Sequence, residues 1–333
     1  MNLSAAIYAI RWLVRDTFRQ ARASGITWVM LAVSGVCILF CLSVSVHGQL
    51  SLEHGDGPAE FLPANDPQAD PEKAARAGVD VAGAEMTMAF GAVRLPLARD
   101  GRDGVRFIQL VLAAGVADAL GVLLALIWTA GFLPTFLEPG AASVLLAKPA
   151  PRWSLLAGKY LGVLAFVGCQ ALVFVGGTWA ALGLRTGVWD MAYLLCVPLL
   201  LLHFAVFFSF SALLAVCTRS TVVCVIGSLL FWLVCWGMNY GRHLVAAVPD
   251  VQQVPGSLTW LVEGGYWVLP KPADLGLILF DALDAGHHFG KGVALQNVQA
   301  RGDFHPELSI LSSLVFTVAM LYVAGRQFVT TDY

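Results

Sequence analysis

Three polar residues lie inside long apolar stretches of this 333-residue sequence, and their side chains are the ones most suited to binding or acid–base chemistry. Asp118 is the only acid within the apolar body of its stretch, and Gln170 and His203 lie within the next two stretches. An ionised carboxylate in the middle of a membrane costs several kcal/mol, so we expect Asp118 to face a bundle interior, a wet cavity or a partner. The alternative is that its helix starts later and that Asp118 lies in the outer headgroup layer.

Gln170 and His203 carry groups that form hydrogen bonds between membrane helices. The two side chains could pair with each other across a helix interface, or each could bond to another neighbouring helix. Both arrangements leave open which element each side chain faces.

The other metal-binding or reactive side chains form no recognisable site. Cys37 and Cys41 share a helix face at i and i+4, but no second cysteine pair or nearby histidine completes a site for a soft metal. The spacing of a later group fits no known ligand template: His287, His288, His305 and Glu307. The sequence also lacks a phosphate-binding GxxxxGK[ST] loop, a GxSxG elbow and an HExxH motif. We therefore expect no catalytic residue, no metal and no cofactor in this chain.

Composition indicates that membrane-spanning helices position these residues. The chain is 58% hydrophobic and 13% charged, whereas about 25% of residues are charged in an average soluble protein. A net charge of −2 is too small to indicate a nucleic-acid partner. The stretch 26–46 exceeds the apolar region of a signal peptide, about 7–15 residues, so we interpret it as a retained transmembrane helix.

We predict an all-α polytopic membrane protein with six transmembrane helices. The helices are expected at 26–46, at 106–132, at three places within 154–240 (155–182, 192–216 and 221–240), and at 308–328 with a short tail to residue 333.

The arrangement of Lys and Arg residues in short flanks predicts the orientation. With the N-terminus inside, the only short external loop holds Arg185 alone, and the cytoplasmic flanks hold the other basic residues: Arg11, Arg15, Arg19, Arg22, Lys148, Arg152, Lys159, Arg219 and Arg326. This asymmetry predicts an integral protein of the cell (inner or plasma) membrane with both termini in the cytoplasm.

Residues 1–25 have the pattern of a basic amphipathic helix that lies in the headgroup plane. Apolar residues recur at helical spacing, and four arginines occupy the remaining faces. The alternative is an ordinary basic segment beside the membrane that only sets the orientation.

The two long loops, 47–105 and 241–307, are expected outside the membrane. In the first, apolar residues nearly alternate on both sides of Gly91, which predicts a β-hairpin in a small external subdomain. In the second, Pro270 and Pro272 break the chain before a short helical pattern at 273–283, so we interpret this loop as partly re-entrant or surface-lying.

The segment 133–153 predicts a short helix between two spans. Pro139 suits the first position of a helix, and the carboxylate of Glu138 favours the positive end of the helix dipole. Leu145 and Leu146 would be its apolar contact residues, and Pro149 would end it. The alternative is a plain cytoplasmic loop.

This segment, with Arg152, Gly158 and Lys159 after it, resembles the coupling-helix region of ABC-2-type ABC transporter permeases. The resemblance implies a transmembrane permease subunit, paired with itself or a second permease, that binds a separate ATP-binding subunit and exports a substrate. It implies contact with that subunit through the following residues: Glu138, Gly140, Leu145, Leu146, Arg152 and Lys159.

Under the same resemblance, Asp118, Gln170 and His203 are candidates for the translocation path or the dimer interface. Two other functions stay open at this point. One is a membrane anchor or sensor that binds a partner through its external loops, and the other is an intramembrane enzyme that brings Asp118 and a histidine together.

Overall fold

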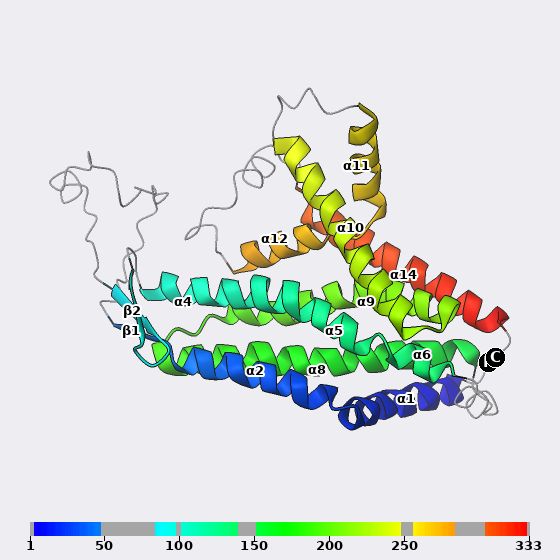
Figure 1. Ribbon diagram of the computed structural model, residues 1–333, viewed down its shortest axis with the longest axis horizontal. Coiled ribbons are helices and arrows are strands. Elements are labelled where there is room, and N and C mark those ends of the chain that lie inside the picture. Colours follow the sequence, from blue (N-terminus) through cyan, green and yellow to red (C-terminus); the bar gives the residue numbers. More distant parts are fainter. Residues whose placement is uncertain are drawn as a thin grey trace.

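The structure is a computed structural model that describes residues 3–47, 84–97, 101–138, 151–247, 256–283 and 304–331. Helices make up almost all of this part of the chain (Figure 1). Five helical segments are long and apolar enough to cross a membrane, and a bent helix pair makes a sixth if it is one span. The predicted fold class, an all-α polytopic membrane protein, is therefore confirmed, and the chain is an integral membrane protein.

Two helices joined at a sharp bend begin the described chain. α1 (Leu3–Ala23) and α2 (Ile26–Leu42) meet at Gly25, whose φ of 76° lies in the left-handed region that glycine adopts without steric cost. The bend between the two helices is 72°. The helix expected at the N-terminus is present, and its position in the headgroup plane stays a prediction.

α1 packs against the N-terminal part of α8 (Arg152–Thr186), where two glycines leave room for it. A Cβ added to Gly158 would lie 2.8 Å from Leu13 Cδ1, and one added to Gly162 would lie 2.5 Å from Thr17 Oγ1. Gly158 and Gly162 are one turn apart, and this spacing of small residues predicts close helix packing. Close packing is present here, with α1 as the packing partner.

We expect Gly162→Leu to separate α1 from α8, because the new side chain would meet Thr17 and the backbone of Val14. Overpacking of this kind costs about 1–3 kcal/mol, which lowers Tm by about 5 °C. Gly176→Leu on the same helix is the matched control, since no atom lies within 4 Å of a Cβ added there. Thermal unfolding of the purified variants in detergent measures the difference, and equal Tm values would show that the α1–α8 contact tolerates the added volume.

The second span consists of consecutive helices: α4 (Gly101–Leu110), η1 (Val111–Gly121), α5 (Val122–Thr129) and α6 (Phe132–Phe136). η1 is a π-helix, a rare form that is frequent at functional sites. The sequence predicts an end at residue 132, but the span reaches Phe136. Helix can continue there because Pro134 lies in the first turn of α6, where a backbone N–H has no helical partner in any case.

α9 (Cys196–Thr218) lies at the centre of the bundle and packs against α5, α8, α10 and α14. The 3-10 helix η2 (Met191–Leu195) precedes it, and a tight turn at Arg219, with a φ of 55°, joins it to α10 (Thr221–Ala247). The prediction that the fifth span ends at 240 is wrong, because the helix continues to Ala247. Beyond residue 240, Arg242 bonds to Glu263 and His243 bonds to Asp274, which lie on two later helices.

Three further helices complete the described chain: α11 (Gly256–Val268), α12 (Pro272–Ala282) and α14 (Pro306–Thr330). The short helix expected near 273–283 is thus present as α12. In Figure 1 the end of α10 and the start of α14 lean away from the other spans, and α11 and α12 lie beside these two ends.

A small antiparallel sheet lies at the end of α2 that is remote from α1 (Figure 1). Its strands are β1 (Ser45–His47), β2 (Ala84–Met88) and β3 (Val93–Leu97), in the order β1-β2-β3. The hairpin predicted around Gly91 is confirmed, whereas the prediction that the first span continues to residue 46 is wrong. α2 ends at Leu42, and the next residues pair with β2, a strand distant in sequence.

Candidate functional site

Asp118 and His203 form a buried pair between the second and fourth spans. His203 Nδ1 lies 2.5 Å from Asp118 Oδ1, and the side chains of His203 and Asp118 are 1% and 15% exposed. Gly276 of α12 closes the other side, because a Cβ added there would lie 3.8 Å from Asp118 Oδ2. Asp118 therefore faces the interior of the bundle, and the alternative of a helix that starts later is wrong.

In the described part of the chain, the histidine of this pair uses only one of its two ring nitrogens for a hydrogen bond. Nδ1 of His203 bonds to the carboxylate, whereas the buried Nε2 has no hydrogen-bond partner among the described residues. A carboxylate at Nδ1 holds an imidazole in one orientation and favours a proton on Nδ1, which leaves Nε2 as an acceptor. The arrangement can therefore hold a proton or accept a hydrogen bond from a group that enters the bundle.

Gln170 does not pair with His203, so that alternative is wrong. The Gln170 side chain lies on α8 and lines a pocket, and its buried Oε1 accepts no hydrogen bond from the described part of the chain. His203 bonds instead to Asp118 on the second span, whose carboxylate is a stronger acceptor than an amide.

Lys159 is buried and connects α8 with α1 and α6. Its ammonium donates to Gln20 Oε1 at 2.6 Å and pairs with Asp16 Oδ2 at 3.3 Å. It also lies 5.9 Å from the ring centres of both Phe132 and Phe136 in α6. With only 2% of its side chain exposed, Lys159 holds three helices together at this end of the bundle.

Arg152 and Glu138 flank the segment for which a coupling helix is predicted. Arg152 Nη1 donates to the carbonyl oxygens of Val329 at 3.1 Å and Thr331 at 3.3 Å, which lie at the C-terminal end of α14. Glu138 is exposed just after α6. Gly140, Leu145 and Leu146 lie outside the described residues.

A second buried carboxylate, Asp274 on α12, is one that the sequence reasoning missed. Its Oδ1 accepts hydrogen bonds from His243 at 2.6 Å and Asn239 at 2.8 Å, both on α10. Its Oδ2 accepts from Tyr266 on α11 at 2.9 Å and from Ser309 on α14 at 2.6 Å. Asp274 thus ties one short helix to three others.

Charge and burial around Asp274 act in opposite directions. Burial by itself would raise the pKa of Asp274, but hydrogen bonds from His243, Ser309 and Asn239 outweigh it and hold the pKa below its usual range. Burial lowers the pKa of the nearby Lys271, and the charge of Asp274 opposes that shift. The Lys271 ammonium lies 4.7 Å from the Tyr266 ring centre and donates to Ser312 Oγ at 2.5 Å. The hydrogen bonds to Asp274 therefore hold its carboxylate in the ionised form.

One signal in the sequence could have revealed this cluster. Asn239 and His243 are four residues apart and therefore share one face of α10. A polar pair at the end of an apolar span predicts a polar partner nearby, and Asp274 is an acid in the first turn of a predicted helix. The pairing itself depends on how α12 folds back, which no local pattern contains.

We expect Asp274→Ala to destabilise the protein strongly, because it leaves four buried donors without their acceptor. Loss of one partner of a buried charged pair costs about 3–5 kcal/mol, so Tm should fall by about 10 °C. Asp274→Asn is the control: it keeps the size and one acceptor oxygen and should lose less. Thermal unfolding in lipid nanodiscs measures both, and an unchanged Tm for the alanine variant would show that α12 is held by its apolar contacts alone.

Comparison with known protein families gives a match over most of the chain. The model of a family described as "ABC-2 family transporter protein" matches residues 11–240, which is more than half of the chain. The matched range includes Asp118, His203, Arg152 and Lys159. It ends at Tyr240, within α10. None of the curated proteins matches this chain.

Proposed function

This chain belongs to the ABC-2 family of transporter proteins, and we propose that it is the permease subunit of an exporter whose ATPase is a separate polypeptide. Membership makes the chain a transmembrane component of a transporter. The ATPase contact, the export direction and the pairing with itself or with a second permease are the proposed parts.

The observation that carries the proposal is the meeting of four helices at Arg152 and Lys159, which follow the predicted coupling segment in the sequence. Arg152 bonds α8 to the end of α14, and Lys159 bonds α8 to α1 while it packs on α6. A force applied between Glu138 and Arg152 would therefore reach α1, α6, α8 and α14 together. A short helix in this place, with Leu145 and Leu146 in a groove of the ATPase, would convert closure of the ATPase pair into movement of the spans.

In this proposal Lys159 and Arg152 act on coupling without contact with the ATPase. Both side chains are already engaged within the chain, with the buried Lys159 ammonium on Asp16 and Gln20 and the Arg152 guanidinium on α14. Glu138 is exposed and is free to reach a partner surface. The contact itself is therefore assigned to residues 138–146.

The proposed orientation puts this end of the bundle, with both termini, in the cytoplasm. Arg11, Arg15, Arg19 and Arg22 lie on α1 at that end, together with Arg152 and Lys159 of α8, in agreement with the excess of positive charge in cytoplasmic flanks. The β1–β3 sheet, α11 and α12 then lie on the outer side, and export would move a substrate toward them.

Asp118 and His203 are proposed as a polar point on the substrate path. They lie within two spans and next to Gly276 of α12, and no described residue bonds to His203 Nε2, which can serve as an acceptor. Their convergence is also the geometry that an intramembrane enzyme would need. The family match favours transport over that function, and it favours transport over a membrane anchor or sensor.

Site-directed labelling tests the proposed orientation. Single cysteines at Ala69, Ala300 and Ala141, in a chain without its seven native cysteines, would be exposed to an impermeant maleimide. We expect the first two to label in intact spheroplasts and Ala141→Cys to label only after lysis, because the coupling segment must face the ATPase. Labelling of Ala141→Cys in intact spheroplasts would invert the orientation and remove the basis for the ATPase contact.

A further inference from the structure

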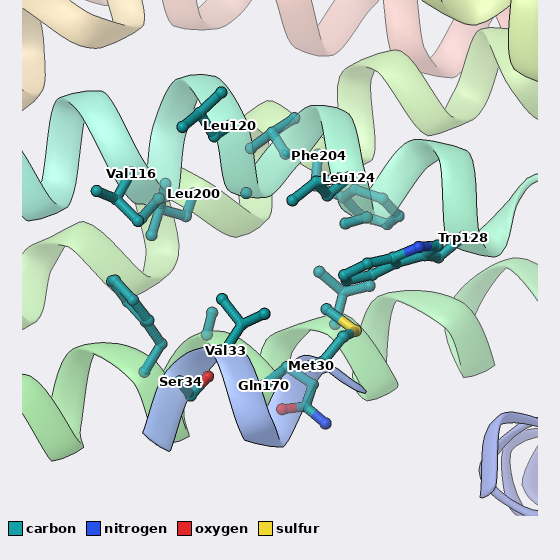
Figure 2. Close-up of a pocket in the computed structure, with 17 residues that line it drawn as sticks. Met30, Val33, Ser34, Val116, Leu120, Leu124, Trp128, Gln170, Leu200 and Phe204 are labelled. Carbon is teal, nitrogen blue, oxygen red and sulfur yellow. The ribbon is translucent and has the colours of Figure 1, made fainter. Parts of the chain in front are cut away.

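A pocket of about 200 Å³ lies among four spans of the bundle. Figure 2 shows α2 and α8 on one side and η1 and α5 on the other, with the Trp128 ring at one end. Leu200 and Phe204 of α9 also line it. The lining is mostly aliphatic and aromatic.

The pocket opens to the outside of the bundle between α2 and the second span, on a surface whose exposed side chains are apolar. Val33 on α2 is 43% exposed, and Leu120 and Leu124 on the opposite wall are 59% and 37% exposed. The deeper residues Leu200 and Phe204 are 6% and 0% exposed. An exposed rim and a buried floor give a lateral entrance, so the pocket can be filled by a molecule from the bilayer.

Size and lining decide what kind of molecule fits. An engineered apolar cavity of about 150 Å³ stays dry and binds small hydrocarbons, so a pocket somewhat larger and mostly apolar favours a hydrocarbon group over water. It is too small for a whole lipid and large enough for part of one aliphatic chain, with the rest leaving through the entrance.

Gln170 contributes a polar side chain to this mostly apolar lining. Its side chain is 8% exposed, lies in the pocket wall, and leaves Oε1 without a partner among the described residues. A buried amide oxygen without a hydrogen bond is unfavourable, and a donor on a bound molecule would remove that cost. Figure 2 shows the Ser34 side chain on the same side of the pocket as Gln170.

We propose that this pocket binds a bilayer-soluble amphiphile with an aliphatic chain and one hydrogen-bond donor, such as a hydroxyl group. The chain lies between Trp128, Leu124 and Phe204, and the donor reaches the Gln170 amide. The site is built from one copy of the chain and needs no ATPase, so it stands or fails independently of the proposed exporter assembly.

The test uses 6-bromoundecan-1-ol as the ligand, because a bromine atom quenches a nearby indole. The chain has ten tryptophans, so the difference between wild type and Trp128→Phe isolates the signal of Trp128. We expect saturable quenching of Trp128 in nanodiscs. Ala171→Phe should weaken it at least about tenfold by filling the pocket, whereas Val173→Phe, on the outer face of the same helix, should not.

A second comparison keeps the result clear even if the filled variant folds poorly. Gln170→Leu keeps the volume and should bind the alcohol about fivefold more weakly, the value of one hydrogen bond. It should bind 6-bromoundecane, which lacks the hydroxyl group, as wild type does. Equal quenching in wild type and Ala171→Phe would overturn the pocket, and equal affinity of wild type for the alcohol and the alkane would overturn the role of Gln170.

Two sources share this chemistry, a resident lipid-like molecule and a transported one. Binding that weakens when an ATPase subunit and ATP are added identifies cargo, and binding that stays constant through turnover identifies a resident molecule. Both outcomes support the pocket, and the quenching test without the ATPase does not depend on the proposed exporter assembly.

Discussion

Replacement of Leu145 and Leu146 together by Asp is expected to separate this chain from its ATPase subunit. In the proposed complex both leucines enter an apolar groove, so each Asp would bury a charge without a partner. Each such charge costs at least about 2 kcal/mol, and the pair would weaken the contact about a thousandfold. Affinity purification of the tagged chain, with the retained ATPase measured by immunoblot, gives the result directly.

Leu145→Met with Leu146→Met is the matched control for this pair. It keeps apolar side chains of similar volume and should retain the ATPase, because such exchanges usually cost less than about 1.5 kcal/mol. If the double Asp variant retained the ATPase at the wild-type yield, the coupling-helix assignment would be wrong, although the family membership would be untouched.

The second large effect is expected at Asp118. Asp118→Leu should leave membrane insertion intact and lower ATP-dependent activity of the reconstituted complex by about tenfold, a change of about 1.4 kcal/mol. Asp118→Lys should be more severe, because an ammonium group would replace the carboxylate against His203 in a place that is 15% exposed. ATPase turnover of the assembled complex measures both variants side by side.

A double replacement distinguishes a functional pair from a structural one. Asp118→Leu with His203→Leu removes both polar partners, and such paired removal can be nearly neutral for stability. We expect the double variant to fold with a Tm near that of wild type and to stay inactive. Recovery of activity in the double variant would show that the pair only supports the fold, and wild-type activity in both Asp118 variants would remove Asp118 from the site.

The apolar spans were predictable because each one is a local property of the chain. The number of consecutive apolar residues decides whether a segment can cross a membrane. The glycine pair at Gly158 and Gly162 and the hairpin around Gly91 also follow from short spacing rules, and the structure contains both. Family membership has the same basis, since the matched residues are read in sequence order.

The partners of the buried polar residues were decided only by the tertiary structure. His203 bonds to Asp118, which is 85 residues away, and not to Gln170. The neighbours of Lys159 in the sequence do not predict that its side chain is buried, because its partners Asp16 and Gln20 come from α1. A charged residue in an apolar segment predicts that a polar partner exists, but it does not predict which residue that partner is.

The residues at which the helices end were also decided by the tertiary structure. α2 stops at Leu42 because the next residues find hydrogen bonds on β2, and α10 continues to Ala247 while Asn239 and His243 bond to Asp274 on α12. The sequence by itself determined that this is a membrane transporter component with apolar spans. Long-range hydrogen bonds decided where those spans end and which polar groups meet, because a buried donor or acceptor is satisfied by whatever group the fold brings to it.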